Sequence, residues 1–356
     1  DNLRTVLISA VIFYHASITY GATGFWPYIE GQAYEITEIV MSLDLLVVGS
    51  GPTGISIAAE ARRAELDVLL VDRGPLLASL LEFPRDMVFF TTADRLEIAD
   101  IPFSLPHAKP SRREAITYYQ GVVRAYDLQL ALHQRVVSID RSGGGFDVTT
   151  RSEAGERQYR ARAVALATGY FDNPRTLGVP GEERDWVQHR YDDPYAHFGE
   201  RVLVVGGGNS AAEAAMELWR AGADVTVVHR GSELKPSVKY WLKPDFENRV
   251  AEGAFEALYE ASIESFDHRS VRVIQKGREV TLPADAAYVL IGYEPDVDLL
   301  RASGVQVDAE SLVPAFDAES CESNVAGLYL AGTLQAGRDT NRIFIENSRA
   351  HSPRIV

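Results

Sequence analysis

The stretch that decides the fold is GSGPTG, residues 49–54. It follows a short apolar run, residues 43–48, which predicts a buried parallel strand. Residues 52–66 have apolar residues at helical spacing, and residues 67–71 (DVLLV) predict the next strand. A G-x-G-x-x-G between a strand and a helix of one βαβ unit is typical of a dinucleotide-binding domain.

Each glycine of this first fingerprint has a separate task. Gly49 permits the tight turn, Gly51 lets a pyrophosphate approach the backbone, and Gly54 allows the helix to pack closely on the strand. The N–H groups at the start of the helix and its dipole bind the phosphates. Asp72 closes the second strand at the right spacing to accept a hydrogen bond from a ribose hydroxyl.

A second unit of the same kind begins at residue 201. The strand-like run 201–205 leads into GGGNSA, residues 206–211, a helical stretch follows, and the next strand-like run, 224–228, ends in His229-Arg230. A cation at that place accepts a 2′-phosphate that a carboxylate would repel, so the pattern favours NADP(H) over NAD(H). Lys235 and Lys239 are either further ligands of this phosphate or solvated surface lysines.

Two fingerprints with opposite charges at the ribose predict two different dinucleotides, FAD and NADPH, because hydride can pass from a nicotinamide to a flavin. We expect an α/β protein of two Rossmann-like domains, with the NADPH domain inserted in the FAD domain. Residues 41–195 and 296–356 are expected to form the FAD domain, and residues 196–295 the NADPH domain. Residues 178–198 and 291–295 predict the two crossings between them.

The order of these motifs resembles the two-dinucleotide-domain flavoproteins that include thioredoxin reductase. It comprises residues 49–54, the ATG turn at 167–169, residues 206–211, IGYEP at 291–295 and residues 327–332. From Met41 onward the chain is similar to bacillithiol-disulfide reductases of the YpdA type. The stretches that carry this likeness are residues 82–84, 89–92, 96–98, 235–239 and 344–347.

The resemblance implies the location of both cofactors and a homo-oligomeric assembly. The residues expected to bind FAD are Gly49, Gly51, Pro52, Thr53, Gly54, Asp72, Arg73, Val137, Ala167, Thr168, Gly169, Gly332 and Thr333. The residues expected to bind NADPH are Gly206, Gly208, Asn209, Ser210, His229, Arg230, Lys235 and Gly292.

Two positions depart from the family pattern. Thioredoxin reductases have an aspartate for the flavin ribityl chain where this chain has Thr333, and YpdA-type relatives also lack that aspartate. The narrower family often has a cysteine in the first fingerprint where this chain has Thr53, whose hydroxyl cannot form a mixed disulfide. We expect Thr53 to cap the helix or to contact a phosphate instead.

The composition excludes several classes of function. Cys321 is the only cysteine among 356 residues, so there is no Cys-x-x-Cys pair, and a lone thiol fits a reducing cytoplasm. The formal net charge of −15 disfavours nucleic acid as a partner, and residues 41–356 show no membrane pattern. We expect no metal.

These observations predict an FAD-dependent oxidoreductase that passes hydride from NADPH to FAD and then to a low-molecular-weight disulfide such as bacillithiol disulfide. The alternatives are a flavin monooxygenase, an NADPH reductase for a small redox protein of the ferredoxin or flavodoxin type, and a non-catalytic dinucleotide-binding redox sensor. A monooxygenase predicts F-x-G-x-x-x-H in the linker, and residues 178–191 lack it. Glu346 and His351 are candidate proton donors, although His351 also fits a solvent-facing helix position.

The two ends of the sequence need separate interpretations. Residues 6–22 are nearly all apolar, and residues 1–21 resemble the opening helix of the membrane acyltransferase-3 family. We interpret residues 1–40 as an upstream fragment that is not part of the fold, with a single-helix anchor or an amphipathic docking arm as alternatives. We expect a closing helix from about Asn341 that is still running at Val356, so that a short C-terminal piece is missing.

Overall fold

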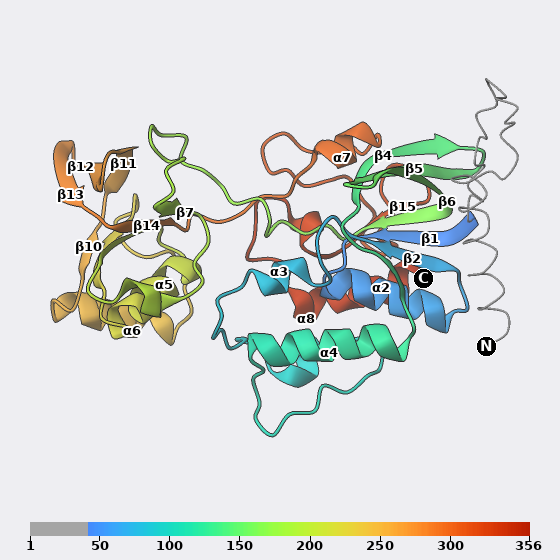
Figure 1. The fold of residues 1–356 in the computed structure, drawn as a ribbon, viewed down its shortest axis with the longest axis horizontal. Coiled ribbons are helices and arrows are strands. Elements are labelled where there is room, and N and C mark those ends of the chain that lie inside the picture. The colour runs from blue at the N-terminus through green and yellow to red at the C-terminus, as the bar shows by residue number, and fades with distance from the viewer. Residues whose placement is uncertain (1–41) are drawn as a thin grey trace, which may run out of the picture. The chain divides into compact units, whose positions relative to one another are not determined.

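The computed structural model describes residues 42–356, shown in colour in Figure 1. The interpretations of residues 1–40 lie outside the described residues. Within residues 42–356 no helix combines the length and the apolar character that a membrane crossing requires.

The first sheet has seven strands in the order β3-β2-β1-β6-β5-β4, with β15 paired to β6. β1 is parallel to β2 and to β6, whereas β4, β5 and β6 pair antiparallel. The sheet is therefore a parallel sheet extended by an antiparallel β meander. Its strands are β1 (Ser42–Val48), β2 (Val68–Val71), β3 (Gln129–Ala131), β4 (Arg135–Ser142), β5 (Gly145–Ser152), β6 (Gly155–Leu166) and β15 (Leu328–Leu330).

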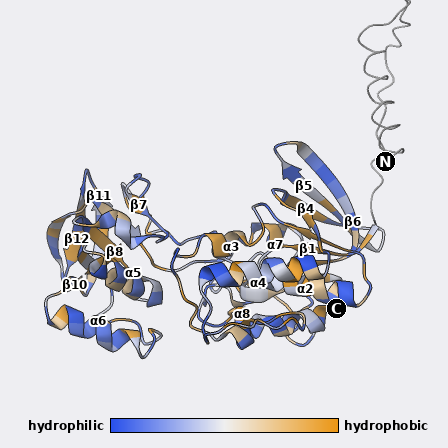
Figure 2. Cartoon of the chain, turned by 60° about the horizontal axis from the view of Figure 1, so that its bottom comes forward, coloured by the Kyte–Doolittle hydropathy of each residue, from blue (hydrophilic) through white to orange (hydrophobic). Residues whose placement is uncertain are grey.

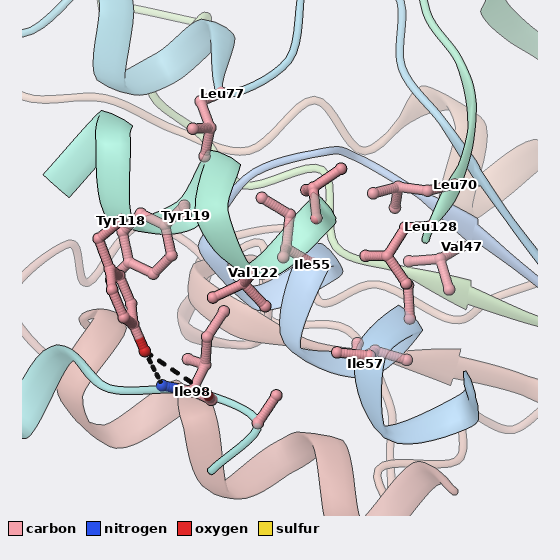
Figure 3. Packing of buried hydrophobic residues seen from close by; sticks show 14 of the residues in the cluster. Val47, Ile55, Ile57, Leu70, Leu77, Ile98, Tyr118, Tyr119, Val122 and Leu128 are labelled. Atoms are coloured by element: carbon pink, nitrogen blue, oxygen red, sulfur yellow. Dashed lines mark hydrogen bonds between the residues drawn. The ribbon is translucent and has the colours of Figure 1, made fainter. Parts of the chain in front are cut away.

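Helices α2 (Pro52–Arg63) and α4 (Arg112–Ala125) pack on one face of this sheet. Both carry hydrophilic and hydrophobic residues, as expected for helices with one buried face (Figure 2). Ile55 and Ile57 of α2 and Tyr119 of α4 are completely buried between the helices and β2 (Figure 3). α2 ends at Arg63, three residues before the predicted end, because Glu65 adopts a left-handed conformation at φ 60°. The same unit contains α3 (Ala78–Leu81) and η1 (Ala93–Leu96).

The second sheet has five parallel strands in the order β10-β9-β8-β14-β7. Its strands are β7 (Val187–Gln188), β8 (Arg201–Val205), β9 (Asp224–Val228), β10 (Glu256–Leu258) and β14 (Ala286–Val289). The helices of this unit are η2 (Pro194–His197), α5 (Asn209–Arg220) and α6 (Leu242–Ala251). β7 belongs to this sheet although it precedes residue 196, the expected start of the second domain.

A third, antiparallel sheet, β11-β12-β13, completes the second unit. Its strands are β11 (Ala261–Phe266), β12 (Ser270–Gln275) and β13 (Arg278–Pro283). The chain leaves the first sheet after β6 and returns to it at β15, so the second unit lies between two strands of the first. The α/β class predicted from the two fingerprints is confirmed.

After β14 the chain forms α7 (Asp298–Ala302) and η3 (Gly332–Ala336). The closing helix predicted from about Asn341 begins later, at Ile345, and consists of three short pieces. These are α8 (Ile345–Ser348), η4 (Arg349–His351) and α9 (Ser352–Ile355). The three pieces follow one another directly, since Ser348, Arg349, His351 and Ser352 all have right-handed helical dihedral angles, and Pro353 lies in the first turn of α9, where no N–H is required. The last piece packs against α2, where Ser352 Oγ donates to Ser56 Oγ at 2.7 Å.

We predict opposite effects of alanine at two helical glycines. A Cβ at Gly54 would lie 1.8 Å from the carbonyl oxygen of Gly49, which is backbone and cannot move aside. Gly54→Ala should therefore lower the free energy of unfolding by about 1–3 kcal/mol or more. Gly121 in α4 has no atom within 4 Å of such a Cβ, so Gly121→Ala should raise it by roughly 0.5–1 kcal/mol. Urea unfolding of the two variants beside wild type measures both, and equal effects would contradict the packing argument.

Candidate functional site

A cleft of about 1460 Å³ joins the two fingerprints and the C-terminal segment. It brings together most of the residues that the sequence predicts for the two cofactors. Those in its wall are Gly49, Gly51, Pro52, Thr53, Asp72, Arg73, Ala167, Thr168, Gly169, Gly332 and Thr333 for FAD, with Gly206, Gly208, Asn209, Ser210, His229, Arg230, Lys235 and Gly292 for NADPH. Gly54, Val137 and His351 are not in the wall; Val136, beside a β-bulge in β4, lines it in place of Val137.

The first fingerprint forms a tight turn whose middle is open. A Cβ at Gly49, where φ is +107°, would lie 2.4 Å from the carbonyl oxygen of Ala167. Gly51 begins α2 as its N-cap and has no atom within 4 Å of a Cβ. The outer glycines are thus required by packing, whereas the space at Gly51 faces the cleft. This is the arrangement that a pyrophosphate at the N-terminus of a helix needs.

Asp72 shapes this turn. One carboxylate oxygen accepts from Ser50 N at 2.6 Å and from Ser50 Oγ at 2.8 Å, and the other accepts from Gly74 N at 2.8 Å. The second oxygen keeps an acceptor position, and Asp72 lines the cleft, so a ribose hydroxyl remains a suitable ligand. The neighbouring Arg73 forms an ion pair with Asp172.

The second fingerprint repeats the same geometry. A Cβ at Gly206, where φ is +149°, would lie 2.4 Å from the carbonyl oxygen of Leu290. Gly208 is the N-cap of α5 and, like Gly51, has no atom within 4 Å of a Cβ. Asn209 fixes the loop that follows by donating to the carbonyl of Ser237 at 3.2 Å and accepting from the N–H of Lys239 at 2.9 Å.

His229 has a role that the sequence did not reveal. Its side chain is buried, with 8% of the residue exposed, and its ring would lie 2.4 Å from a Cβ at Gly207. Burial lowers the pKa of His229, and the charges of Lys235 and Arg230 lower it further, so the ring is neutral at pH 7. The expectation of a cation at His229 is therefore corrected: the ring supports the glycine loop, and Arg230 supplies the charge at the end of β9.

Three cations that line the cleft lie close enough to interact near the place expected for a 2′-phosphate. The backbone N–H of Lys235 donates to the carbonyl of Gly207 at 2.9 Å. Burial lowers the pKa of its side-chain ammonium, and the charges of Arg230 and Arg175 lower it further. Arg175 lines the cleft and was missed by sequence reasoning, because no motif marks it. Lys239 lies elsewhere, with its ammonium 5.5 Å from the ring of Phe90 and 6.0 Å from that of Phe344.

The role expected for Thr53 as a helix cap is wrong. The N-cap of α2 is Gly51, and no side chain caps this helix. Thr53 Oγ1 instead shares a hydrogen bond of 3.0 Å with Ser348 Oγ of α8, while Ser348 Oγ also donates to the carbonyl of Ile345. Thr53 therefore joins the first fingerprint to the C-terminal segment and still lines the cleft.

His351 is buried, not solvent-facing, with only 7% of the residue exposed. Its Nδ1 accepts the N–H of Gly332 at 3.0 Å, and burial, followed by the charge of Arg354, lowers its pKa to about 4. A neutral ring outside the cleft that accepts a backbone N–H is placed to hold the turn at Gly332. Glu346, in contrast, lines the cleft and accepts from Thr91 Oγ1.

Glu213 is a titratable residue of the cleft that sequence reasoning missed. It lies on the first turns of α5, directly after the second fingerprint, and lines the cleft with Glu217. Burial raises its pKa to about 7, Glu217 adds to the effect, and Lys239 opposes it. Its helical position directly after G-x-G-x-x-A was the signal in the sequence that could have found it. Glu213 is therefore a candidate proton donor at neutral pH.

Comparisons with known proteins identify the family. The model of the pyridine nucleotide-disulphide oxidoreductases matches residues 46–332. The chain is 34% identical to bacilliredoxin reductase Bdr of Bacillus subtilis over 87% of its length and 95% of the relative. The chain belongs to the pyridine nucleotide-disulphide oxidoreductase family. It is a flavin- and nicotinamide-dependent oxidoreductase, which confirms the predicted family and class of enzyme.

Solved structures agree with this assignment. Bacillithiol disulfide reductase Bdr (YpdA) from Bacillus cereus superposes with a TM-score of 0.86 at 33% identity, over 88% of this chain and 97% of that one. The Staphylococcus aureus protein of the same name gives 0.84 at 32% identity, over the same shares of the two chains. Thioredoxin reductase of T. acidophilum, at 22% identity and a TM-score of 0.71 over 88% and 96%, shares the fold.

We predict that His351 makes the fold less stable in acid. Its pKa of about 4 lies below the ordinary value of 6.5, so between these values the unfolded chain binds more protons. The contribution is fully present above about pH 6.5 and falls as the pH drops toward 4, by up to about 2 kcal/mol between pH 7 and 5. His351→Gln keeps an acceptor for Gly332 and should lose this part of the pH dependence in urea unfolding.

Replacement of the exposed His268, between β11 and β12, by glutamine is the matched control and should leave the wild-type pH dependence. If His351→Gln lost stability in acid as steeply as wild type, the buried neutral state of His351 would be refuted.

Proposed function

We propose that the protein oxidises NADPH, binds FAD, and reduces a low-molecular-weight disulfide such as bacillithiol disulfide. The observation that supports this most is a single cleft with two phosphate-binding turns that differ in charge at the ribose. Asp72 follows the first turn, and Arg230 and Lys235 follow the second. The solved relatives named for bacillithiol disulfide support the acceptor.

The residues present fit both dinucleotides. The space beside Gly51 and Gly208 leaves the N-terminal N–H groups of α2 and α5 free to bind pyrophosphates. A carboxylate at Asp72 suits the free ribose of FAD, whereas the cations at the second turn suit the 2′-phosphate of NADPH. A bound flavin supplies the chemistry, because it can accept hydride from a nicotinamide and give an electron pair to an acceptor.

The overall reaction consumes one NADPH, one proton and one disulfide, and yields NADP⁺ and two thiols. The S–S bond breaks, the electron pair comes from the hydride, and the thiols take up two hydrogens. The chain's own residues position the two rings and exclude water, which places reacting atoms in near-attack geometry. Glu213, whose pKa is raised to about 7, can hold the proton that the reaction needs inside the cleft.

No thiol of the chain takes part in this proposal. Cys321 is the only cysteine in the sequence, and it is 99% buried in the loop before β15, outside the cleft wall. Thr53 occupies the fingerprint position, and its hydroxyl is engaged with Ser348. In this proposal a bound flavin would supply the electrons to the disulfide, and no mixed disulfide with a cysteine of the chain would form.

We predict that Cys321→Ser turns over bacillithiol disulfide with NADPH at the wild-type rate per bound flavin, and that iodoacetamide does not inhibit either protein. Consumption of NADPH and release of thiols, measured together, should give two thiols per NADPH. Loss of turnover in Cys321→Ser, with flavin still bound, would contradict direct transfer. If only bacilliredoxin, a quinone or oxygen reoxidised the protein, the proposed acceptor would be replaced.

We predict that the anaerobic protein is bleached much faster by NADPH than by NADH. Arg230→Asp places a carboxylate where the 2′-phosphate is proposed and should lower the NADPH to NADH ratio of kcat/KM about tenfold to a hundredfold. Arg278→Asp is the control, because Arg278 is exposed on β13 outside the cleft. An unchanged ratio in Arg230→Asp would show that this site does not read the 2′-phosphate.

A further inference from the structure

We propose that Arg175, a residue of the linker between β6 and β7, is a third ligand of the 2′-phosphate and decides the preference for NADPH together with Arg230 and Lys235. The inference deepens the proposed function and rests on it. It adds a cation from outside the βαβ unit to a site that the sequence assigns to that unit alone.

The backbone of Arg175 is fixed where the two crossings meet. Its N–H donates to the carbonyl of Gly292 at 3.0 Å, and the adjacent Pro174 forms a β-bridge with Tyr293. Glu294 N donates back to the carbonyl of Asn173 at 3.1 Å. The outgoing and returning segments therefore run side by side at this point, and the position of Arg175 relative to Gly292, in the cleft wall, is set by hydrogen bonds.

The side chain of Arg175 lacks the partners that other linker arginines have. Arg184 donates to the carbonyl of Phe266 at 2.9 Å, and Arg190 pairs with Glu82 and donates to the carbonyl of Phe171. Within residues 42–356, the guanidinium of Arg175 makes no ion pair or hydrogen bond, although the residue is half-buried and lines the cleft. Its charge is therefore available to a ligand.

Arg175 lines the cleft within electrostatic range of the two cations proposed for the 2′-phosphate. The positive charges of Arg230 and Arg175 both act on Lys235 and lower the pKa of its ammonium. No carboxylate forms an ion pair with any of the three in the described part of the chain, although the chain as a whole carries a net charge of −15. Three such cations near one another repel, and a phosphate dianion between them would remove that repulsion.

The position on the linker has a consequence for the protein. Arg230 and Lys235 follow β9 and belong to the second unit, whereas Arg175 belongs to the crossing segment. A 2′-phosphate bound by all three would join the linker to the second sheet through the ligand. NADH, which lacks this phosphate, would leave the linker without that link.

The test measures binding of two fragments to the flavin-loaded protein by calorimetry. In Arg175→Gln the affinity for 2′,5′-ADP should fall by roughly tenfold or more, whereas the affinity for 5′-AMP should change less than about twofold. Arg175→Lys should recover part of the loss. KM for NADPH should rise with kcat unchanged, and Arg278→Gln, an exposed cation of the same unit, should match wild type.

Other outcomes would overturn the inference. An equal loss for both fragments would place Arg175 at the pyrophosphate or in a structural role, and wild-type affinities in Arg175→Gln would remove it from the site. A wild-type protein that did not distinguish 2′,5′-ADP from 5′-AMP would refute the proposed function itself. A preference for 2′,5′-ADP that persisted unchanged in Arg175→Gln would refute only the role of Arg175.

Discussion

The contact on which the rest of the structure depends is the approach of a helix to the strand before it at each glycine turn. In the first turn, a Cβ at Gly54 would lie only 1.8 Å from the carbonyl oxygen of Gly49, so only glycine fits there. In the second, the helix position is Ala211, and a Cβ at Gly206 would lie 2.8 Å from the Cβ of Ala211 and 2.4 Å from the carbonyl oxygen of Leu290, just after β14. This packing directs the first N–H groups of each helix into the cleft, and no side chain fills the space beside Gly51 or Gly208. The phosphate binding that we propose would thus be a consequence of backbone packing.

The parts of the molecule that the sequence predicted are those with local signatures. A strand, a glycine turn and a helix are encoded within about 30 adjacent residues, so both units and their order could be predicted, and most of the predicted cofactor residues lie in the cleft wall. Asp72 and Arg230 follow from the same rule, because each comes directly after the second strand of its unit.

The residues that were missed or misinterpreted depend on contacts between distant positions. Thr53 bonds to Ser348, 295 positions away, so its neighbours in sequence suggested a cap that the structure does not have. His229 is buried against Gly207, which helps to lower its pKa, and His351 is buried where it accepts the N–H of Gly332, 19 positions earlier. Arg175 has no motif, and only the pairing of the two crossings brings it to the cleft.

The acidic net charge of the chain helps to explain why unpaired cations in the cleft are informative. With a net charge of −15, most arginines that the structure describes have carboxylate or carbonyl partners, as Arg201 has in Asp285. Cations without such partners in a cleft mark a place where an anion is expected from outside the chain. The two turns use the same backbone device for a pyrophosphate, so the backbone alone cannot distinguish their ligands. In the function that we propose, the side chains beyond the second strand of each unit make that distinction, and with it they set which dinucleotide brings electrons to the cleft and which one receives them.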